Sequence, residues 1–388
     1  MLILVPRRAF MSWHIRKSMH LLTLIIIALT LLLTVACEQK KEPIRIGYVG
    51  GLTGRVAGLG IAGRDGVLLA TENVNRAGGI NGHKVVVSIK DDRQDAATAK
   101  KVVKELIAEN VVAIVGHMTS SMTAATLPIV NDANKVLISP TSKSHYFSGI
   151  DDHLFRATTS ISYNAQKIAA MAFNEMGLRN FAVIYDGNNR AFTESWLEQF
   201  RQPYEALGGK IVIAKEFKSG SPDLSFFELC KDIVKQKPDA FLILASALDC
   251  ALVTQQFQKL EYRVPMFASE WSFTSDLLNY GGRAVEGLIS YHSFNAESQR
   301  AQYLAYKKQF VSRFGYDPSF ASVLSYDATM LLFKAIEQNP DPKQIKRSLL
   351  GMGTFPGLQS DFKFDQYGDV NRRLFRTIVV NGQFKVIN

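Results

Sequence analysis

The feature that most constrains this chain is a unit that recurs from Ile44 onward: a short apolar run bounded by turn residues, followed by an amphipathic stretch of 12–18 residues. Strand-like runs cover residues 44–49, 85–89, 111–115, 136–139, 181–185, 211–214, 240–244 and 264–268. Helix-like stretches cover residues 60–76, 96–108, 121–131, 164–176, 193–207, 224–235 and 251–260. Alternating strands and helices bury both faces of a parallel sheet through right-handed crossovers. The pattern therefore predicts an α/β fold with doubly wound sheets.

The number of strands and the C-terminal pattern refine this prediction. So many strands within residues 44–268 favour two sheets over one open sheet, which would be strained. After Val285 the rhythm changes, and residues 297–350 are expected to be mostly helical. A closing β-hairpin is predicted from runs at 362–364 and 374–380 with an Asn381-Gly382 turn.

The first 36 residues are typical of a secretory signal. They contain four basic residues and no acidic ones, then an apolar run, Leu21–Leu33, and small residues up to Ala36. An apolar run of 13 residues is short for a helix that spans a bilayer, although an uncleaved span extended through Val35 stays the alternative. We therefore expect residues 1–36 to be removed.

Cys37 follows a sequence that resembles a bacterial lipobox, in which the cysteine becomes the lipidated first residue of the mature chain. Thr34 takes the position of the usual Leu, with Leu33 beside it. Residues 37–43 are polar and end in proline, which predicts a short tether to a lipid anchor. We expect an exported protein, periplasmic or on the cell surface, that is attached to the membrane through Cys37.

Composition excludes several classes of function. The chain is 47% hydrophobic and 21% charged, as ordinary globular proteins are. Removal of residues 1–36 lowers the formal net charge from +10 to +6, and no basic run interleaved with aromatics follows, so no nucleic-acid partner is expected. Besides Cys37 only Cys230 and Cys250 remain, which gives no zinc or redox spacing. Whether these two form a disulfide is open.

Three segments lie where ligands bind in open α/β sheets, after the carboxyl ends of strands. One, Ile114–Thr123, joins a strand to a helix start that carries hydroxyls, which could bind a carboxylate or only cap the helix. The second, Ile138–Ser144, offers the hydroxyls of Thr141 and Ser142 and the Lys143 ammonium. In the third, Glu270 and Trp271 suit a ligand ammonium, unless Glu270 is a solvated loop acid.

Signatures of catalysis are missing from the sequence. We find no Gly-x-Ser-x-Gly elbow, Walker A loop or His-Glu-x-x-His pair. Residues 58–63 match Gly-x-Gly-x-x-Gly, but a dozen loop residues separate them from the preceding strand, which is unlike a dinucleotide site. The acid pairs 91–92 and 151–152 suit caps or solvated turns better than metal ligands. We expect a binding protein with no catalytic residues, metal or cofactor.

A wider pattern identifies a family. Its residues are Ile44–Val49 with Leu52-Thr53-Gly54, Gly60, Gly66, Asn75–Gly82, Asp91-Asp92, Gly116-His117 and Ser139-Pro140. In order and spacing over residues 44–388, the chain resembles the branched-chain amino acid and amide binding proteins of ABC transporters, which are type I periplasmic binding proteins. The resemblance implies two doubly wound α/β lobes joined by a three-strand hinge that closes on ligand. Lobe 1 would comprise 44–157 plus 288–353, and lobe 2 would comprise 158–287 plus 354–388.

The same resemblance implies roles for individual residues. Ser120 would hold the carboxylate of an amino acid, with Met118 and Thr119 lining its side chain. Thr141, the position of Lys143, and Glu270 would hold the ammonium. Because Ser120 and Glu270 match the family, a zwitterionic α-amino acid is favoured.

Four positions depart from the family pattern. Lys143 replaces a Thr, and a second cation beside a ligand ammonium would weaken binding. Leu59, Arg190 and Ala247 stand where amino acid binders carry Tyr. Lys143 and Arg190 together could serve a ligand with an extra carboxylate. Alternatively, both point to solvent or pair with Asp186 or Glu194.

The resemblance implies a lipoprotein that captures an amino acid or related small polar solute between two lobes and delivers it to ABC permease subunits. A ligand-sensing input protein for a membrane receptor or kinase is the alternative. The lobes would be the same in both, so the sequence barely separates them.

Overall fold

The computed structural model describes residues 18, 19, 23 and 41–387 and divides the chain into two units, Met1–Glu42 and Pro43–Asn388. Cys37 and nearly all of the predicted signal lie outside the described residues. No helix in the described ranges is both long and apolar enough to cross a membrane. The second unit carries the fold described below.

A five-stranded parallel sheet, the first sheet, has the strand order β2-β1-β3-β4-β5. Its strands are β1 (Ile44–Gly50), β2 (Val85–Asp91), β3 (Ala113–Val115), β4 (Val136–Ser139) and β5 (Leu154–Arg156). The helices packed on it are α2 (Ala57–Arg76), α3 (Ala96–Ala108), α4 (Ser120–Asp132) and α11 (Phe320–Gln338). We call this sheet with these helices the first half.

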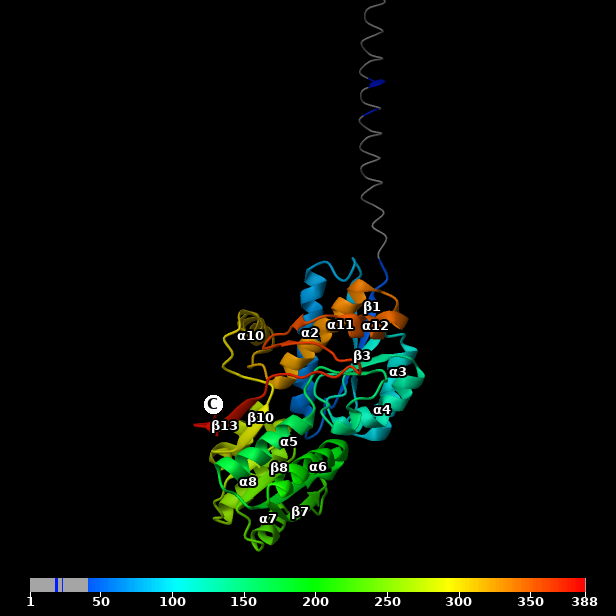
Figure 1. Ribbon diagram of the computed structural model, residues 1–388. Helices are drawn as coiled ribbons and strands as arrows, with labels where there is room; N and C mark the ends of the chain where they lie inside the picture. Colours follow the sequence, from blue (N-terminus) through cyan, green and yellow to red (C-terminus); the bar gives the residue numbers. More distant parts are fainter. Residues whose placement is uncertain (1–17, 20–22, 24–40, 388) are drawn as a thin grey trace, which may run out of the picture. The chain divides into compact units, whose positions relative to one another are not determined.

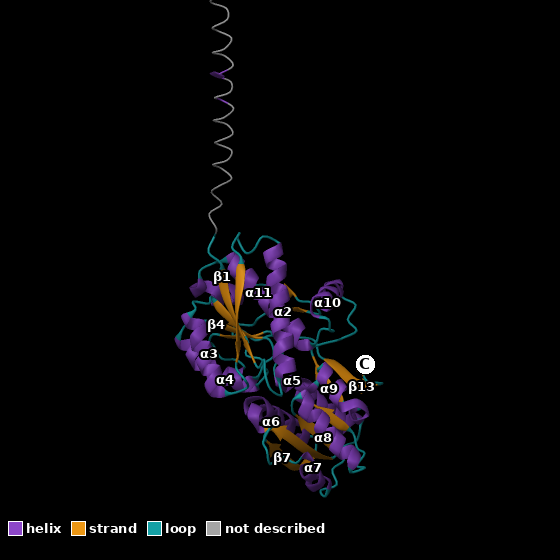
Figure 2. Ribbon diagram, turned by 180° about the vertical axis from the view of Figure 1, so that it is seen from behind, coloured by secondary structure: helices purple, strands orange, loops and turns teal. Residues whose placement is uncertain are grey.

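Helices cover both faces of the first sheet because successive side chains of each strand point to opposite sides. Ile46 and Tyr48 of β1 join the core formed with α2 and α11. Val49 joins a separate core with α3 and α4. Figure 2 shows these two helix pairs on either side of the strands. The near-continuous apolar runs in the sequence follow from this double burial.

A seven-stranded mixed sheet, the second sheet, has the strand order β14-β13-β10-β9-β8-β6-β7, in which β13 is antiparallel to both of its neighbours. Its strands are β6 (Asn180–Asp186), β7 (Lys210–Phe217), β8 (Ala240–Leu244), β9 (Met266–Ala268), β10 (Ile289–His292), β13 (Phe375–Val380) and β14 (Gln383–Ile387). The helices of this part are α5 (Ile161–Ala170), α6 (Arg190–Ala206), α7 (Phe226–Val234), α8 (Ala247–Lys259) and α9 (Ser275–Gly281). We call this sheet with these helices the second half.

Successive side chains of β6 also point to opposite faces of the second sheet, so the second half has two cores. Phe181 and Val183 of β6 pack with α5 and α6, in a core that is continuous with the α2 and α11 side of the first half. Ala182 and Ile184 face a separate core with α7 and α8. Cys230 and Cys250 lie buried in that second core as free thiols.

Three chain segments connect the two halves. They run from β5 to α5, from β10 to α11 and from α11 to β13. The second segment contains α10 (Ala301–Phe314), and the third contains α12 (Ile345–Gly351), β11 (Phe355–Pro356) and β12 (Asp361–Phe362). The first and third segments run side by side, because Thr159 and Val370 form an isolated bridge and Arg372 N donates to Thr159 Oγ1 at 2.6 Å. The lobe boundaries stay a prediction. The pairing of β10 in the second sheet favours a crossing after His292 rather than at 287/288.

Most predicted elements agree with the structure to within a few residues, and three details differ. The closing hairpin pairs β13 with β14 around Asn381 and Gly382, whereas Phe362 belongs to a separate two-stranded ladder with β11. β5 and β10 were not anticipated, because neither contains more than two consecutive apolar residues in the sequence. The helix predicted to reach Met176 ends at Ala170 and continues as a π-helical turn, Met171–Glu175.

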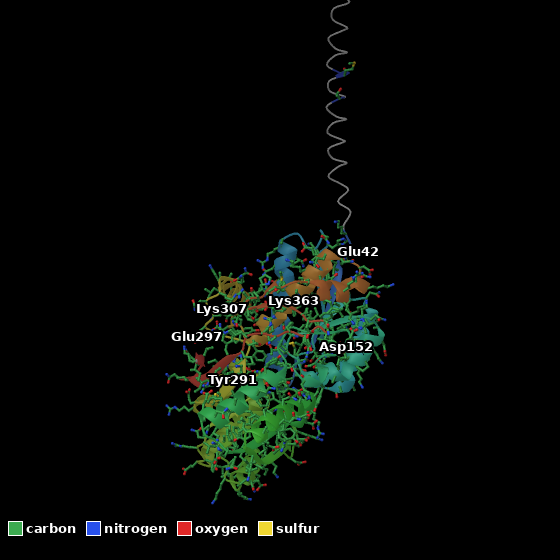
Figure 3. All side chains as sticks on the ribbon, viewed as in Figure 1. Glu42, Asp152, Tyr291, Glu297, Lys307 and Lys363 are labelled. Carbon is green, nitrogen blue, oxygen red and sulfur yellow. The ribbon has the colours of Figure 1, made fainter. Side chains whose placement is uncertain are left out.

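Side chains that end in nitrogen and in oxygen are mixed over the face of this unit drawn in Figure 3. Many of these charges are paired locally, as in the contact of Lys385 Nζ with Glu297 Oε1 at 2.8 Å. On this face, charges of both signs are therefore interspersed.

We predict that Gly66→Ala destabilises the fold. A Cβ at Gly66 would lie 2.2 Å from the backbone oxygen of Ser322, where α2 and α11 cross, so the two helices must separate. The expected loss is about 1–3 kcal/mol of unfolding free energy in urea titration. Gly351→Ala is the matched control, because a Cβ there has nothing within 4 Å. Equal stability of the two variants would contradict the close helix crossing.

Candidate functional site

A cavity lies where strand ends of the two halves meet. Segments after β3, β4 and β5 of the first sheet line it, together with segments after β6, β9 and β10 of the second sheet. The lining residues are Leu59, Met118, Thr119, Ser120, Thr141, Lys143, Thr158, Asn189, Phe192, Glu270, Trp271, His292, Ser293, Phe320 and Leu324. Its volume of about 20 Å³ has room for about one water molecule. A solute of several carbon atoms therefore requires the walls to move apart.

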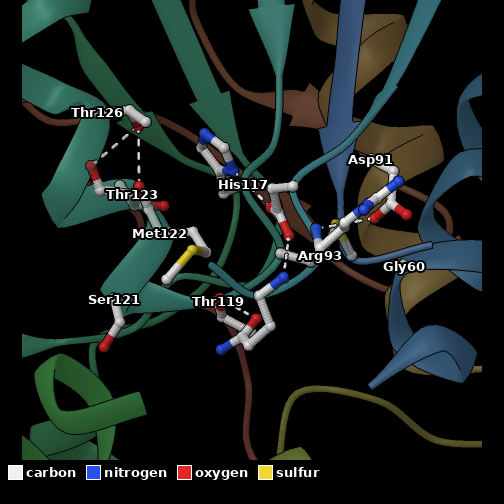
Figure 4. Close-up of polar contacts among 12 residues, drawn as sticks. Gly60, Asp91, Arg93, His117, Thr119, Ser121, Met122, Thr123 and Thr126 are labelled. Carbon is white, nitrogen blue, oxygen red and sulfur yellow. Dashed lines mark hydrogen bonds and ion pairs between the residues drawn. The ribbon is translucent and has the colours of Figure 1, made fainter. Parts of the chain in front are cut away.

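The loop after β3 is held by a buried hydrogen-bond chain, part of which Figure 4 shows. His117 Nδ1 lies 2.7 Å from Asp92 Oδ2, and both side chains are fully buried. Thr119 Oγ1 donates to Gln94 Oε1 at 2.9 Å, and Gln94 N donates to Asp92 Oδ1. The loop that presents Met118 and Thr119 to the cavity is thus fixed from behind by the loop after β2.

Ser120 begins helix α4 beside the cavity. Its hydroxyl oxygen accepts from the backbone amides of Lys143 and Ser144 at 3.3 and 3.4 Å. As the acceptor in both bonds, the hydroxyl keeps its own hydrogen to donate. At the first residue of a helix the amide also has no carbonyl one turn earlier, and the positive end of the helix dipole favours an anion. The arrangement suits a carboxylate.

The loop after β4 is tied to the loop after β3. Thr141 Oγ1 donates to Met118 O at 2.6 Å, and Ser139 Oγ donates to His117 O at 2.7 Å. Ser142 is fully buried behind the cavity wall, where its hydroxyl contacts that of Thr123. The two loops therefore form one rigid wall from the first half.

The Lys143 ammonium, which belongs to that wall, lies 3.0 Å from Glu270 Oε1 of the second half. Both side chains are about 95% buried. Lys143 Nζ also lies 3.5 Å from Asn164 Oδ1, and Asn164 Nδ2 donates to Tyr291 O, which orients the amide. Glu270 Oε2 accepts a long hydrogen bond of 3.4 Å from Trp196 Nε1. An ion pair therefore joins the two halves inside the cavity.

Apolar side chains form the remaining wall. Leu59 of α2 and Phe320 and Leu324 of α11 come from the first half. Trp271 and Phe192 come from the second half, with ring centroids 5.7 Å apart in an edge-to-face arrangement. This wall suits a hydrocarbon body of a ligand.

Three buried residues of the cavity present polar atoms without a hydrogen-bond partner. They are Thr158, through Oγ1, His292, through both ring nitrogens, and Glu270, through Oε1, whose 3.0 Å contact with Lys143 Nζ is an ion pair. Burial, and secondarily the charge of Lys143, lowers the pKa of His292 to about 3. The imidazole is therefore neutral at pH 7, with one donor and one acceptor nitrogen. Buried polar atoms in native proteins nearly always have a hydrogen-bond partner, so the atoms of Thr158 and His292 are candidates for hydrogen bonds to a ligand.

Contacts across the cleft hold the two halves together beside the cavity. Arg55 forms an ion pair with the fully buried Asp249, and Arg55 Nε donates to Ser219 Oγ at 2.8 Å. Ser121 N of α4 donates to Asn189 Oδ1 at 3.1 Å. The structure is thus a closed arrangement of the halves.

Most of the residues predicted from sequence to contact ligand meet in this cavity: Leu59, Met118, Thr119, Ser120, Thr141, Lys143, Glu270 and Trp271. Three others do not reach its wall. Ser142 lies behind it, and Ala247 packs in the core with α7 and α8. Arg190 is half exposed and binds Glu216 at 2.6 Å, with Glu194 at 3.6 Å, so its placement favours the local pairing left open above.

Sequence reasoning missed Thr158, which follows β5, and His292 and Ser293, which end and follow β10, because neither strand was anticipated. It also missed Asn189 and Phe192. These follow β6, which was predicted, so the rule that ligands bind after the carboxyl ends of strands could have identified them. Phe320 and Leu324 come from a distant helix and gave no local signal. Among the described residues no group of three or more His, Cys, Asp or Glu side chains could hold a metal ion.

Comparison with known proteins agrees with this architecture. A Leu-, Ile-, Val-, Thr- and Ala-binding protein of Pseudomonas aeruginosa is 24% identical over 340 residues, covering 86% of this chain and 88% of the relative. A branched-chain amino acid transporter substrate-binding protein of Streptococcus pneumoniae, solved with isoleucine, superposes with a TM-score of 0.82 at 22% identity, covering 89% of this chain and 99% of that one. An ABC-transporter solute-binding protein of Rhodopseudomonas palustris, solved with 3,4-dihydroxybenzoic acid, gives 0.79 at 21% identity, with 89% and 95% covered.

The fold is thus that of the type I periplasmic binding proteins, which are solute-binding proteins and not enzymes. The model of the periplasmic binding protein family matches residues 43–383, nearly the whole described unit. The chain belongs to the periplasmic binding protein family.

Proposed function

We propose that the protein is an extracytoplasmic solute-binding lipoprotein that captures an amino acid or related small solute bearing a carboxylate and delivers it to an ABC permease. The observation that carries this proposal is the cavity at the strand ends of both halves, with the Ser120 hydroxyl and the start of α4 in its wall. A solute held there contacts both halves, so its binding energy favours the closed arrangement.

The relatives support the same class of ligand and partner. Isoleucine and 3,4-dihydroxybenzoic acid, the ligands named with two of them, share a carboxylate beside an apolar body. Both of these relatives are named as parts of transporters, which favours transport over the sensory alternative. Closure would create the surface that permease subunits bind.

We expect a small carboxylate solute to raise the melting temperature of the full-length protein purified in detergent. A ligand that binds only the folded state adds about 2.7 kcal/mol of stability at 100 times its dissociation constant. The panel comprises the twenty amino acids, small amides, dicarboxylates, urea-like solutes, and aromatic and 2-oxo acids. A melting temperature unmoved by every compound would contradict the proposal.

Arg55→Ala is predicted to weaken binding of any such solute by about tenfold, equivalent to about 1.4 kcal/mol. Without Arg55 the buried Asp249 loses its cationic partner across the cleft, so the closed state is less populated. Isothermal titration of both variants measures the effect. Arg201→Ala is the control, because Arg201 pairs only within its own helix, with Glu205 at 3.4 Å. Equal affinities of the Arg55→Ala and Arg201→Ala variants would show that the ion pair between Arg55 and Asp249 does not stabilise the closed state.

Cys37→Ser tests the lipid anchor. Acylation needs the cysteine thiol, so we expect the variant to lose incorporation of a labelled fatty acid and to leave the membrane fraction. Cys230→Ser should keep both properties, because Cys230 is buried and burial raises the pKa of its thiol to about 12. Continued labelling of the Cys37 variant would refute lipidation at this residue.

A further inference from the structure

The ion pair between Lys143 and Glu270 bears on what the cavity can bind. Glu270 is the one acidic side chain among the residues that line the cavity, so a ligand ammonium would have to use it. Its Oε1 already lies 3.0 Å from the Lys143 ammonium, and Oε2 faces Trp196 Nε1. A second cation brought to this carboxylate would stand next to Lys143 in a buried site, where repulsion between like charges is little screened.

Lys143 is held firmly in this position. Its backbone amide donates to Ser120 Oγ, and its ammonium lies near Glu270 and near Asn164, whose amide is oriented by Tyr291 O. Removal of the Glu270 contact would leave a buried ammonium without its counter-ion, which is costly. A ligand ammonium would thus have to displace an ammonium that the protein itself supplies.

The Lys143 ammonium can also contact an anion. An ammonium group has three N–H donors, and Lys143 Nζ has two oxygen contacts, an ion pair with Glu270 Oε1 at 3.0 Å and a long hydrogen bond of 3.5 Å to Asn164 Oδ1, so a third donor remains. The third, the Ser120 hydroxyl and the start of α4 are the positive groups of the cavity. Glu270 neutralises the charge of Lys143, so the attraction for a ligand carboxylate comes from hydrogen-bond donors, namely the remaining Lys143 N–H, the Ser120 hydroxyl and the start of α4, and not from a net positive charge.

We propose that the ligand of this protein is a small monocarboxylate with an apolar body and no ammonium group, because Lys143 occupies the place on Glu270 that a ligand ammonium would take. The inference rests on the function proposed above and names its substrate class. Thr158 and the neutral His292 can satisfy an uncharged polar substituent beside the carboxylate, such as an oxo or hydroxyl oxygen. Leu59, Phe192 and Trp271 can cover the hydrocarbon part.

Matched pairs of probes test this inference on the full-length protein in detergent. L-Leucine and 4-methyl-2-oxopentanoate differ only in an ammonium or an oxo group next to the carboxylate, as do L-phenylalanine and 3-phenyl-2-oxopropanoate. Isothermal titration should show at least one oxo acid binding ten times or more tightly than its amino acid. An amino acid that binds more tightly than its oxo acid would overturn the inference and leave the proposed function in place.

The variant Lys143→Met keeps the apolar stem and removes the charge. We expect it to weaken oxo-acid binding tenfold or more and to strengthen binding of the matching amino acid, whose ammonium can now pair with Glu270. Lys167→Met, at an exposed position of α5, should leave the preference unchanged. An unaltered preference in a folded Lys143→Met protein would overturn the inference, and if that variant does not fold, the wild-type pairs still decide it. Binding of none of the four probes also overturns the inference, while the wider panel decides the proposed function separately.

Discussion

In a parallel sheet the carboxyl ends of the strands meet at one edge, and this protein uses that constraint twice. The loops after β3, β4 and β5 leave the first sheet toward the same space that the loops after β6, β9 and β10 enter from the second. Residues as far apart in the sequence as Ser120 and His292 therefore line one cavity. Neither half contains the whole site, so binding and the relative position of the halves are coupled.

The polar interactions around the cavity are of two kinds: hydrogen bonds within the first half and ion pairs that cross the cleft. On the first half, the hydroxyls of Ser139 and Thr141 donate to the loop after β3, and Asp92 accepts from His117, so hydrogen bonds connect the loops after β2, β3 and β4 into one wall. Contacts that cross the cleft, such as Arg55 with Asp249 and Lys143 with Glu270, are ion pairs between the halves. A cavity with room for about one water is consistent with a closed state that must open to admit a solute.

Much of the fold could be predicted from the sequence, because double burial gives long apolar strands such as β6 and β8 a strong signal. The strand-end rule also located Ser120, Lys143 and Glu270. What the sequence could not provide was their mutual position. Lys143 was expected in the cleft beside a ligand, in solvent, or paired with Asp186 or Glu194. It lies in the cavity wall, but its partner there is Glu270 from the other half, 127 residues further along the chain. Such a contact depends on the packing of two sheets and has no local pattern. β5 and β10 interrupt their apolar residues with polar ones after one or two positions, so they give no apolar run, and Thr158 and His292 were missed with them.

The most direct test is a crystal structure of the full-length protein with 4-methyl-2-oxopentanoate. We predict that the ligand lies between the two halves, with its carboxylate within hydrogen-bond distance of Ser120 Oγ and Lys143 Nζ. The pair between Lys143 and Glu270 should be intact, and the 2-oxo oxygen should lie beside Thr158 or His292. A ligand bound outside this cavity, or one that displaces Lys143 from Glu270, would contradict the proposed binding mode.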